Sequence, residues 1–322
     1  MLASVNEWVA ALSDGCSMNR VAMKSPYLRS VFYPSDFIAD EQPAFEHALK
    51  VALAARGRLD LFHVVRPGEE YDKSLFPSVR STLERWGCIP FGASAESVEA
   101  TGLEVRRVHS RSTGVVATIE EHVSAAVPDL LVLASHQRTG ADRWLHRALS
   151  EPLARECRVP TLLVPRHGRR FVDEETGNAK VRIVLVPVDH EPNAQPAVSR
   201  AEALLRTLGV VDAHFILLHV GPAWRVPRVQ VSSESGWTHE VETWEGDVVE
   251  NIVASAKAND AELVVMAKSG QRSPLDALRG STTERVAREV PCPLLVVPVE
   301  REAAAAKARA EESEWPVVPA LA

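Results

Sequence analysis

The feature that most constrains this chain is a long internal repeat. Leu130 corresponds to Leu263 and Pro165 corresponds to Pro298, and the members of each pair stand 133 positions apart. A repeat of this length predicts two duplicated domains. The fold must therefore be one that half of the chain can build, with its elements in the same order in both halves.

In the first half, short apolar runs alternate with segments of helical periodicity. Strands alternating with helices predict a parallel sheet that carries helices on both faces. The stretch from 66 to about 102 is rich in Pro, Gly and Ser, and we interpret it as irregular. Strands are expected over 30–33, 59–65, 103–108, 130–133 and 161–164, and helices over 44–55 and 115–127.

The second half repeats this order, with strands expected over 181–186, 215–220, 263–266 and 294–297 and a helix over 248–258. Pro187-Val188-Asp189 closes its first strand as Pro34-Ser35-Asp36 closes that of the first half, and His219 ends its second strand as His63 does. The two histidines therefore indicate a shared fold position instead of a metal ligand. The predicted fold class is α/β, with two tandem open five-stranded parallel sheets and helices on both faces.

The boundaries follow from this pattern and from composition. Residues 1–26 are expected to be a flexible leader or a loosely docked helix, and the charged stretch 167–179 a linker. The first domain is expected to span 27–166 and the second domain 180–299, with 300–322 as a C-terminal tail that is rich in Ala, Glu, Lys and Arg at its start.

One stretch of the second half predicts an anion site. A buried strand, Leu263 to Met266, leads into a loop with Gly270 and Gly280, and Ser281 follows at once. Ser281 and Glu284 have the spacing of a capping box, so a helix should begin here. The free N–H groups and the dipole of a helix N-terminus both favour a phosphate. A turn and a simple helix cap would produce the same pattern, and that alternative stays open.

The spacing Gly270-x9-Gly280-Ser281, followed by the apolar strand at 294–297, resembles the nucleotide-binding signature of the universal stress protein family. That signature reads G-x2-G-x9-G-S/T, and Ala267 stands where it has its first glycine. The resemblance covers both halves. It implies a Rossmann-like nucleotide-binding fold and an adenine nucleotide, ATP or a relative, as the ligand.

The resemblance also implies a role for individual residues. The turn formed by Pro187, Val188 and Asp189 would lie beside the adenine and ribose, and Val220 and Met266 would line them. Backbone at Ala267 and Gly270 would face the phosphates. Structural roles compete with these: Asp189 as a turn residue, and Val220 and Met266 as core. The phosphate oxygens would be held by Gly280, Ser281, Thr282 and Thr283.

The first half departs from the signature where the chemistry would sit. Gln137 occupies the position of Gly270, and Arg147-Ala148 that of Gly280-Ser281. A side chain at these positions hinders the close backbone approach that a phosphate needs. We therefore expect the first half to keep the fold and to have lost the site.

Composition excludes several classes of protein. The net charge of −7 argues against a protein that binds nucleic acid through its overall charge. No apolar run approaches the ~20 residues that span a bilayer. The four cysteines form no C-x-x-C, so neither a disulfide framework nor a metal site is expected. Without a secretory signal, the expected location is the cytoplasm. No catalytic base or metal carboxylate is identifiable, which argues against an enzyme.

The function predicted is that of a stress-response protein. It would bind ATP in its second domain and signal to an unidentified protein partner. A nucleotide-free interaction protein and a weak ATPase or self-phosphorylating enzyme remain as alternatives. In this family the two domains of a tandem protein usually pack as a pseudo-dimer through their last strands, here 161–164 and 294–297, and a further homodimer is left open.

Overall fold

The computed structural model describes residues 28–35, 41–71, 76–135, 153, 158–232, 236–269 and 282–299. Several predicted features lie outside these residues. They include the leader, the tail, and the residues Asp36, Gln137, Arg147, Ala148, Gly270, Gly280 and Ser281.

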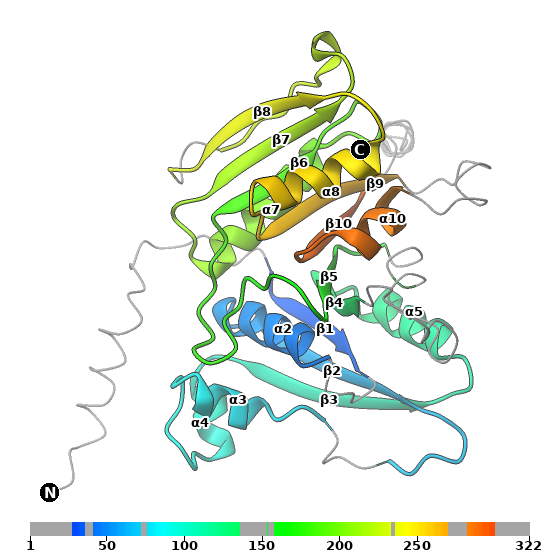
Figure 1. The fold of residues 1–322 in the computed structure, drawn as a ribbon. Helices are drawn as coiled ribbons and strands as arrows, with labels where there is room; N and C mark the ends of the chain where they lie inside the picture. Colours follow the sequence, from blue (N-terminus) through cyan, green and yellow to red (C-terminus); the bar gives the residue numbers. More distant parts are fainter. Residues whose placement is uncertain are drawn as a thin grey trace, which may run out of the picture.

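The described strands form one ten-stranded sheet in the order β3-β2-β1-β4-β5-β10-β9-β6-β7-β8, as Figure 1 shows. Strands β1 to β5 make the first domain and β6 to β10 the second, and all neighbours within a domain are parallel. The predicted fold class is confirmed. The strands are β1 (Ser30–Pro34), β2 (Arg58–Val65), β3 (Glu104–Arg111), β4 (Leu130–Ser135), β5 (Thr161–Pro165), β6 (Ile183–Pro187), β7 (His214–Val220), β8 (Thr238–Trp244), β9 (Leu263–Ser269) and β10 (Leu294–Val299).

The two domains meet where their last strands pair. β5 and β10 run antiparallel, with Leu163 opposite Leu294 and Leu162 opposite Leu295. All four side chains are buried. The predicted pairing of the final strands is therefore confirmed, and it makes the two sheets one.

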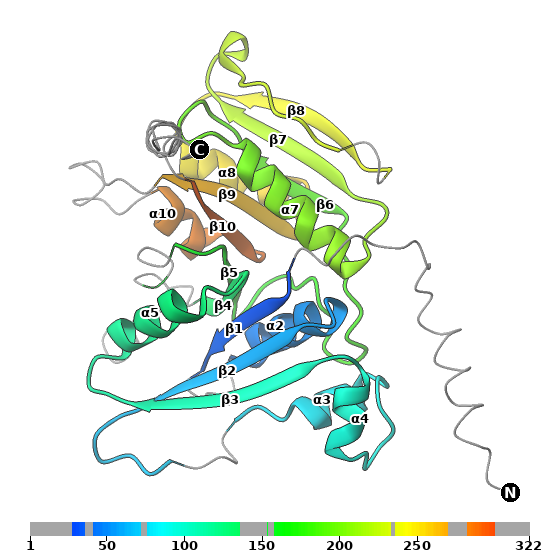
Figure 2. The ribbon, with the colours of Figure 1, turned by 180° about the vertical axis from the view of Figure 1, so that it is seen from behind.

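Helices cover both faces of the sheet (Figures 1 and 2). On one face, α2 (Gln42–Ala54) and α7 (Gln195–Leu208) pack against each other across the domain boundary and share one buried cluster. The opposite face carries α5 (Val115–Ala126), α8 (Val248–Ala258) and α10 (Thr282–Glu289) over a second cluster. Proline within the first turn favours the start of α2 and α7, because its missing N–H would be unpaired there in any case.

The stretch from 66 to 102 was predicted to be irregular, and this prediction is wrong for part of it. It contains two short helices, α3 (Val79–Arg85) and α4 (Ala95–Ala100). Ser78 caps α3, because its Oγ accepts the N–H of Ser81 at 3.2 Å. Helices of one or two turns are too short to display an apolar period, and tertiary docking of buried Val79 and Leu83 stabilises α3 instead.

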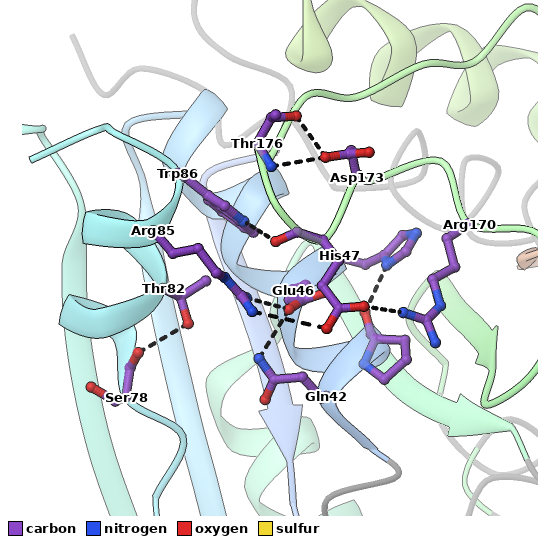
Figure 3. Close-up of polar contacts among 12 residues, drawn as sticks. Gln42, Glu46, His47, Ser78, Thr82, Arg85, Trp86, Arg170, Asp173 and Thr176 are labelled. Carbon is purple, nitrogen blue, oxygen red and sulfur yellow. Dashed lines mark hydrogen bonds and ion pairs between the residues drawn. The ribbon is translucent and has the colours of Figure 1, made fainter.

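The segment predicted as a linker is packed into the structure. Phe171 is only 1% exposed, and its ring lies edge-on to His47 of α2 with 4.3 Å between centroids. The N–H of Phe171 donates to His47 Nε2 at 3.3 Å, and Trp86 Nε1 donates to the carbonyl of Glu174 at 3.0 Å. Figure 3 shows Arg85 of α3 reaching Glu46 beside them. This segment is therefore a structural joint and not a loose tether.

Candidate functional site

The candidate site lies at the topological switch point of the second domain. β6 and β9 are neighbours, with Val184 opposite Leu263, but the chain leaves β6 toward β7 and leaves β9 toward β10. Ligands of open α/β sheets bind outside the carboxyl ends of the strands at such a point. The residues predicted for the site should therefore be found at this edge.

The structure places the described members of that set at the expected edge. Pro187 ends β6 opposite Leu218, and the N–H of Val188 donates to the carbonyl of Leu218 at 2.8 Å. Val220 ends β7, and Met266 lies in β9. If the register of β6 with β9 continues, Pro187 stands level with Met266. Residues from three separate strands thus share one end of the sheet.

Asp189 is exposed and its carboxylate is engaged by its own turn. Its Oδ1 accepts the N–H of His190 at 2.7 Å, and its backbone forms a bridge with Asn193. The side chain of Asn193 in turn accepts the N–H of Gln195, where α7 begins. These contacts support a structural role for Asp189 in its turn, and the residue as a whole is exposed to solvent.

The apolar members of the set differ in burial. Met266 is 6% exposed and belongs to the buried cluster beneath α8 and α10. Val220 and Ala267 are half-buried. Met266 therefore contributes to the core, and Val220 and Ala267 keep part of their surface at the carboxyl edge.

Helix α10 begins at Thr282, directly after the position of the predicted cap. Val286 of this helix is buried, and so is Val290, which follows the last helical residue. Thr282 is exposed and Thr283 is half-buried at the N-terminus. The first turn of α10 therefore carries two hydroxyl side chains that are not fully buried.

A second helix N-terminus lies beside that of α10. Asp247 caps α8, with its Oδ1 accepting the N–H groups of Val249 and Glu250 at 2.9 and 3.0 Å. The N–H of Glu250 is the largest cause that lowers the pKa of Asp247, and Arg285 of α10 adds to it from 3.5 Å. The N-terminus of α8 thus holds the Asp247 carboxylate, which Arg285 partly balances, and the N-terminus of α10 lies next to it.

Lys268 was not among the residues expected at the site. It follows Met266 by two positions in β9 and is half-buried, so it lies on the same face of the sheet as Met266. The period of two along the strand was the signal that points to Lys268, and its ammonium supplies positive charge at the carboxyl edge.

His219 makes the contact that its repeat position predicts. Its Nδ1 lies 3.1 Å from the carbonyl oxygen of Val188, and His63 Nδ1 lies 2.7 Å from that of Ser35. The shared fold position of the two histidines is confirmed. Within the described part of the chain, no group of three or more His, Cys, Asp or Glu side chains is arranged to hold a metal ion.

The first domain fills the corresponding turn with an acidic side chain. The N–H of Ser35 donates to the carbonyl of Phe62 at 2.9 Å, just as Val188 does to Leu218. Ser35 Oγ, however, donates to Glu41 Oε2 at 3.2 Å. Glu41 stands at the N-terminus of α2, where the second domain has Ala194. Glu41 was not foreseen, and its carboxylate opposes a phosphate at this end of the first domain.

Comparison with known proteins bears on the family and the fold of this chain. The model of the universal stress protein family matches residues 28–165 and 230–298. The comparison with curated proteins gives no match. Among the described helices, none is long and apolar enough to cross a membrane.

Three of the solved structures that resemble this chain cover most of it. A universal stress protein from Archaeoglobus fulgidus DSM 4304 has 16% identity and a TM-score of 0.57, covering 85% of this chain and 98% of its own. A functionally unknown protein from Pseudomonas aeruginosa PAO1 has 15% identity and a TM-score of 0.55, covering 89% and 98%. A putative universal stress protein from Pseudomonas aeruginosa UCBPP-PA14 has 16% identity and a TM-score of 0.53, also covering 89% and 98%. At these identities the likeness shows the fold.

Proposed function

This chain belongs to the universal stress protein family, and we propose that its second domain binds ATP or a related adenine nucleotide while its first domain binds none. The observation that carries the proposal is the meeting of three features at one edge of the second domain. These are the turn after β6, the end of β9, and the adjacent N-termini of α8 and α10.

Each feature has a part to play in holding the nucleotide. The half-buried surface of Val220, with the backbone of Val188, would contact the base, and Asp189 would accept a hydrogen bond from the ribose. Thr282 and Thr283 would donate to phosphate oxygens, together with Ala267 and the loop residues Gly270, Gly280 and Ser281. Met266 would support the base from below. Lys268 would add a positive charge, which strengthens phosphate hydrogen bonds.

The bound nucleotide would serve as a signal. Rapid phosphoryl transfer needs a residue that orients the nucleophile and metal ions that neutralise the developing charge. We assign neither role to a residue of this chain. In this proposal the protein works in the cytoplasm, where the nucleotide-bound form is recognised by a protein partner.

Titration of the full-length chain with a fluorescent ATP analogue tests the proposal. Gly280→Val should abolish binding, because a side chain there blocks backbone approach to the phosphate. The matched change in the first half, Arg147→Val, should leave binding unchanged. Equal binding by Gly280→Val and the parent protein would rule the proposal out. Mass spectrometry of ligand released from the purified protein then identifies the nucleotide, and release of labelled phosphate tests for turnover.

A further inference from the structure

We propose that His219 is a positioning residue of the nucleotide site: its imidazole fixes the carbonyl of Val188 and so sets the turn that carries Asp189. This inference rests on the proposed function of the second domain. It concerns a side chain that need not touch the ligand, since His219 is 3% exposed and lies one residue before Val220 at the end of β7.

The chemistry of the contact defines the imidazole tautomer. A carbonyl oxygen can only accept a hydrogen bond, so Nδ1 of His219 must carry the proton that it donates to Val188 over 3.1 Å. The N–H of Val188 already donates to Leu218 at 2.8 Å. Both backbone polar groups of Val188 are therefore hydrogen-bonded to β7. These two bonds fix the backbone position from which Asp189, the next residue, begins the turn.

Gly221 leaves room for the imidazole because it has no side chain. A Cβ on Gly221 would lie 3.0 Å from Nε2 of His219, and the φ angle of this glycine is +148°. Both the contact and the backbone conformation disfavour any other residue. Nε2 is buried and has no hydrogen-bond partner among the described residues. Burial of that unpaired nitrogen is unfavourable, and the hydrogen bond that Nδ1 donates to Val188 offsets part of this cost.

The first domain provides a control for the fold. His63 makes the same Nδ1 contact, to Ser35, but Val65 stands where the second domain has Gly221. The hydrogen bond itself is thus a property of the duplicated fold. Its effect on a ligand should appear only in the second domain, because only there does the turn belong to a proposed nucleotide site.

The test uses two substitutions of His219 in the full-length chain. The amide nitrogen of His219→Asn can take the place of Nδ1 and keep a donor for Val188, whereas His219→Leu keeps bulk but removes the donor. We expect His219→Leu to weaken binding of the fluorescent ATP analogue about tenfold, the effect of ~1.4 kcal/mol, and His219→Asn to restore most of it. Amide hydrogen exchange at Asp189 and His190 should be faster in His219→Leu than in His219→Asn.

His63→Leu is the matched control. It should lower thermal stability as His219→Leu does and leave affinity for the analogue unchanged. If His219→Leu binds as tightly as the parent protein, or if His219→Asn is as weak as His219→Leu, the positioning role is overturned while the proposed function stands. If the parent protein binds no nucleotide, the proposed function fails and this role fails with it.

Discussion

The turns that follow β1 and β6 have the same backbone and different chemistry. In both, a backbone N–H donates to the second strand, at 2.9 Å for Ser35 and 2.8 Å for Val188, and a histidine contacts the carbonyl of the same residue. The first turn then receives the carboxylate of Glu41, and the second turn does not. The comparison teaches that the two domains keep the same main-chain hydrogen bonds at this turn, while the side chains around the turn differ.

The helices that follow these turns diverge in the same way. α2 and α7 both begin with Gln-Pro-Ala, but α2 carries Glu46 and His47 where α7 carries Ser199 and Arg200. Glu46 and His47 are fully buried against the linker and α3, whereas Ser199 is exposed. In the first domain these positions of the helix are therefore buried against neighbouring elements. In the second domain the position of Ser199 stays at the surface.

The largest effect is expected from breaking the strand pair that joins the halves. Leu295→Lys places a charge at a position that is 0% exposed beside Leu162. Burying an unpaired charge should cost about 5 kcal/mol of unfolding free energy and separate the domains. Denaturant unfolding and small-angle scattering measure both effects.

Val241→Lys is its control, because Val241 is 50% exposed on the outer strand β8. A lysine ammonium at this exposed position stays hydrated, so the substitution should change neither stability nor scattering. Unchanged scattering and stability in Leu295→Lys would show that the β5–β10 pair does not hold the halves together.

The next largest effect should come from the linker joint. Phe171→Ala removes a ring that is 1% exposed and packs on His47, and a buried Phe→Ala change costs about 3–5 kcal/mol. Phe91→Ala removes a ring that is 96% exposed and should have almost no effect. Thermal unfolding compares the two variants. Similar melting temperatures would mean that the linker is dispensable for stability.

A pH dependence should distinguish the two helices. Burial lowers the pKa of His47 to about 4 from its usual value near 6.5, because desolvation disfavours the charged form and Arg170 lies nearby. The unfolded chain therefore takes up this proton first. Stability due to neutral His47 is complete above pH 6.5 and is lost as the pH falls toward 4, by at most about 3 kcal/mol.

Glu46 reduces this dependence of the unfolding free energy on pH, because burial raises the pKa of its carboxyl despite the hydrogen bonds from Gln42 and Arg85. A raised carboxyl pKa favours the folded state as the pH falls. His47→Gln should make the unfolding free energy depend less on pH between pH 6.5 and 4. Arg200→Gln, the matched change in α7, should leave that pH dependence unchanged. Identical slopes in all three proteins would disprove the role of His47.

The smallest effect concerns the helix caps at the carboxyl edge. Asp247 caps α8, while Gly114 stands at the matching position of α5 and makes no side-chain cap. Gly114→Asp should gain about 0.3 kcal/mol, and Asp247→Gly should lose a little stability. Since the pKa of Asp247 is lowered, its contribution is present above pH 4 and fades below it. Equal midpoints for Asp247→Gly and the parent at pH 7 would contradict this.

Much of the fold follows from local patterns. Apolar runs located every described strand except β8, and helical periods located α2, α5 and α8, because each pattern reports which face of a short segment is buried. The capping box located α10, whereas β8 and α7 were not among the predicted elements. The two-turn helices α3 and α4 escaped detection because they offer too few residues for a period. Lys268 escaped because it lies in the strand and not in the glycine loop that defined the expected site.

By itself, then, the sequence determined the duplication, the parallel α/β order of each half and the asymmetry between Gly280 and Arg147, all of which reside in neighbouring residues or in a constant spacing. Only the tertiary structure decided that Phe171 is core, since its partner His47 is 124 positions away in the chain. The same holds for His219, whose contact with Val188 spans 31 positions. Such contacts form between elements that are far apart in the chain and meet only when the sheet has formed. A local pattern of hydrophobic residues shows which face of an element is buried, but it does not show which other element covers that face.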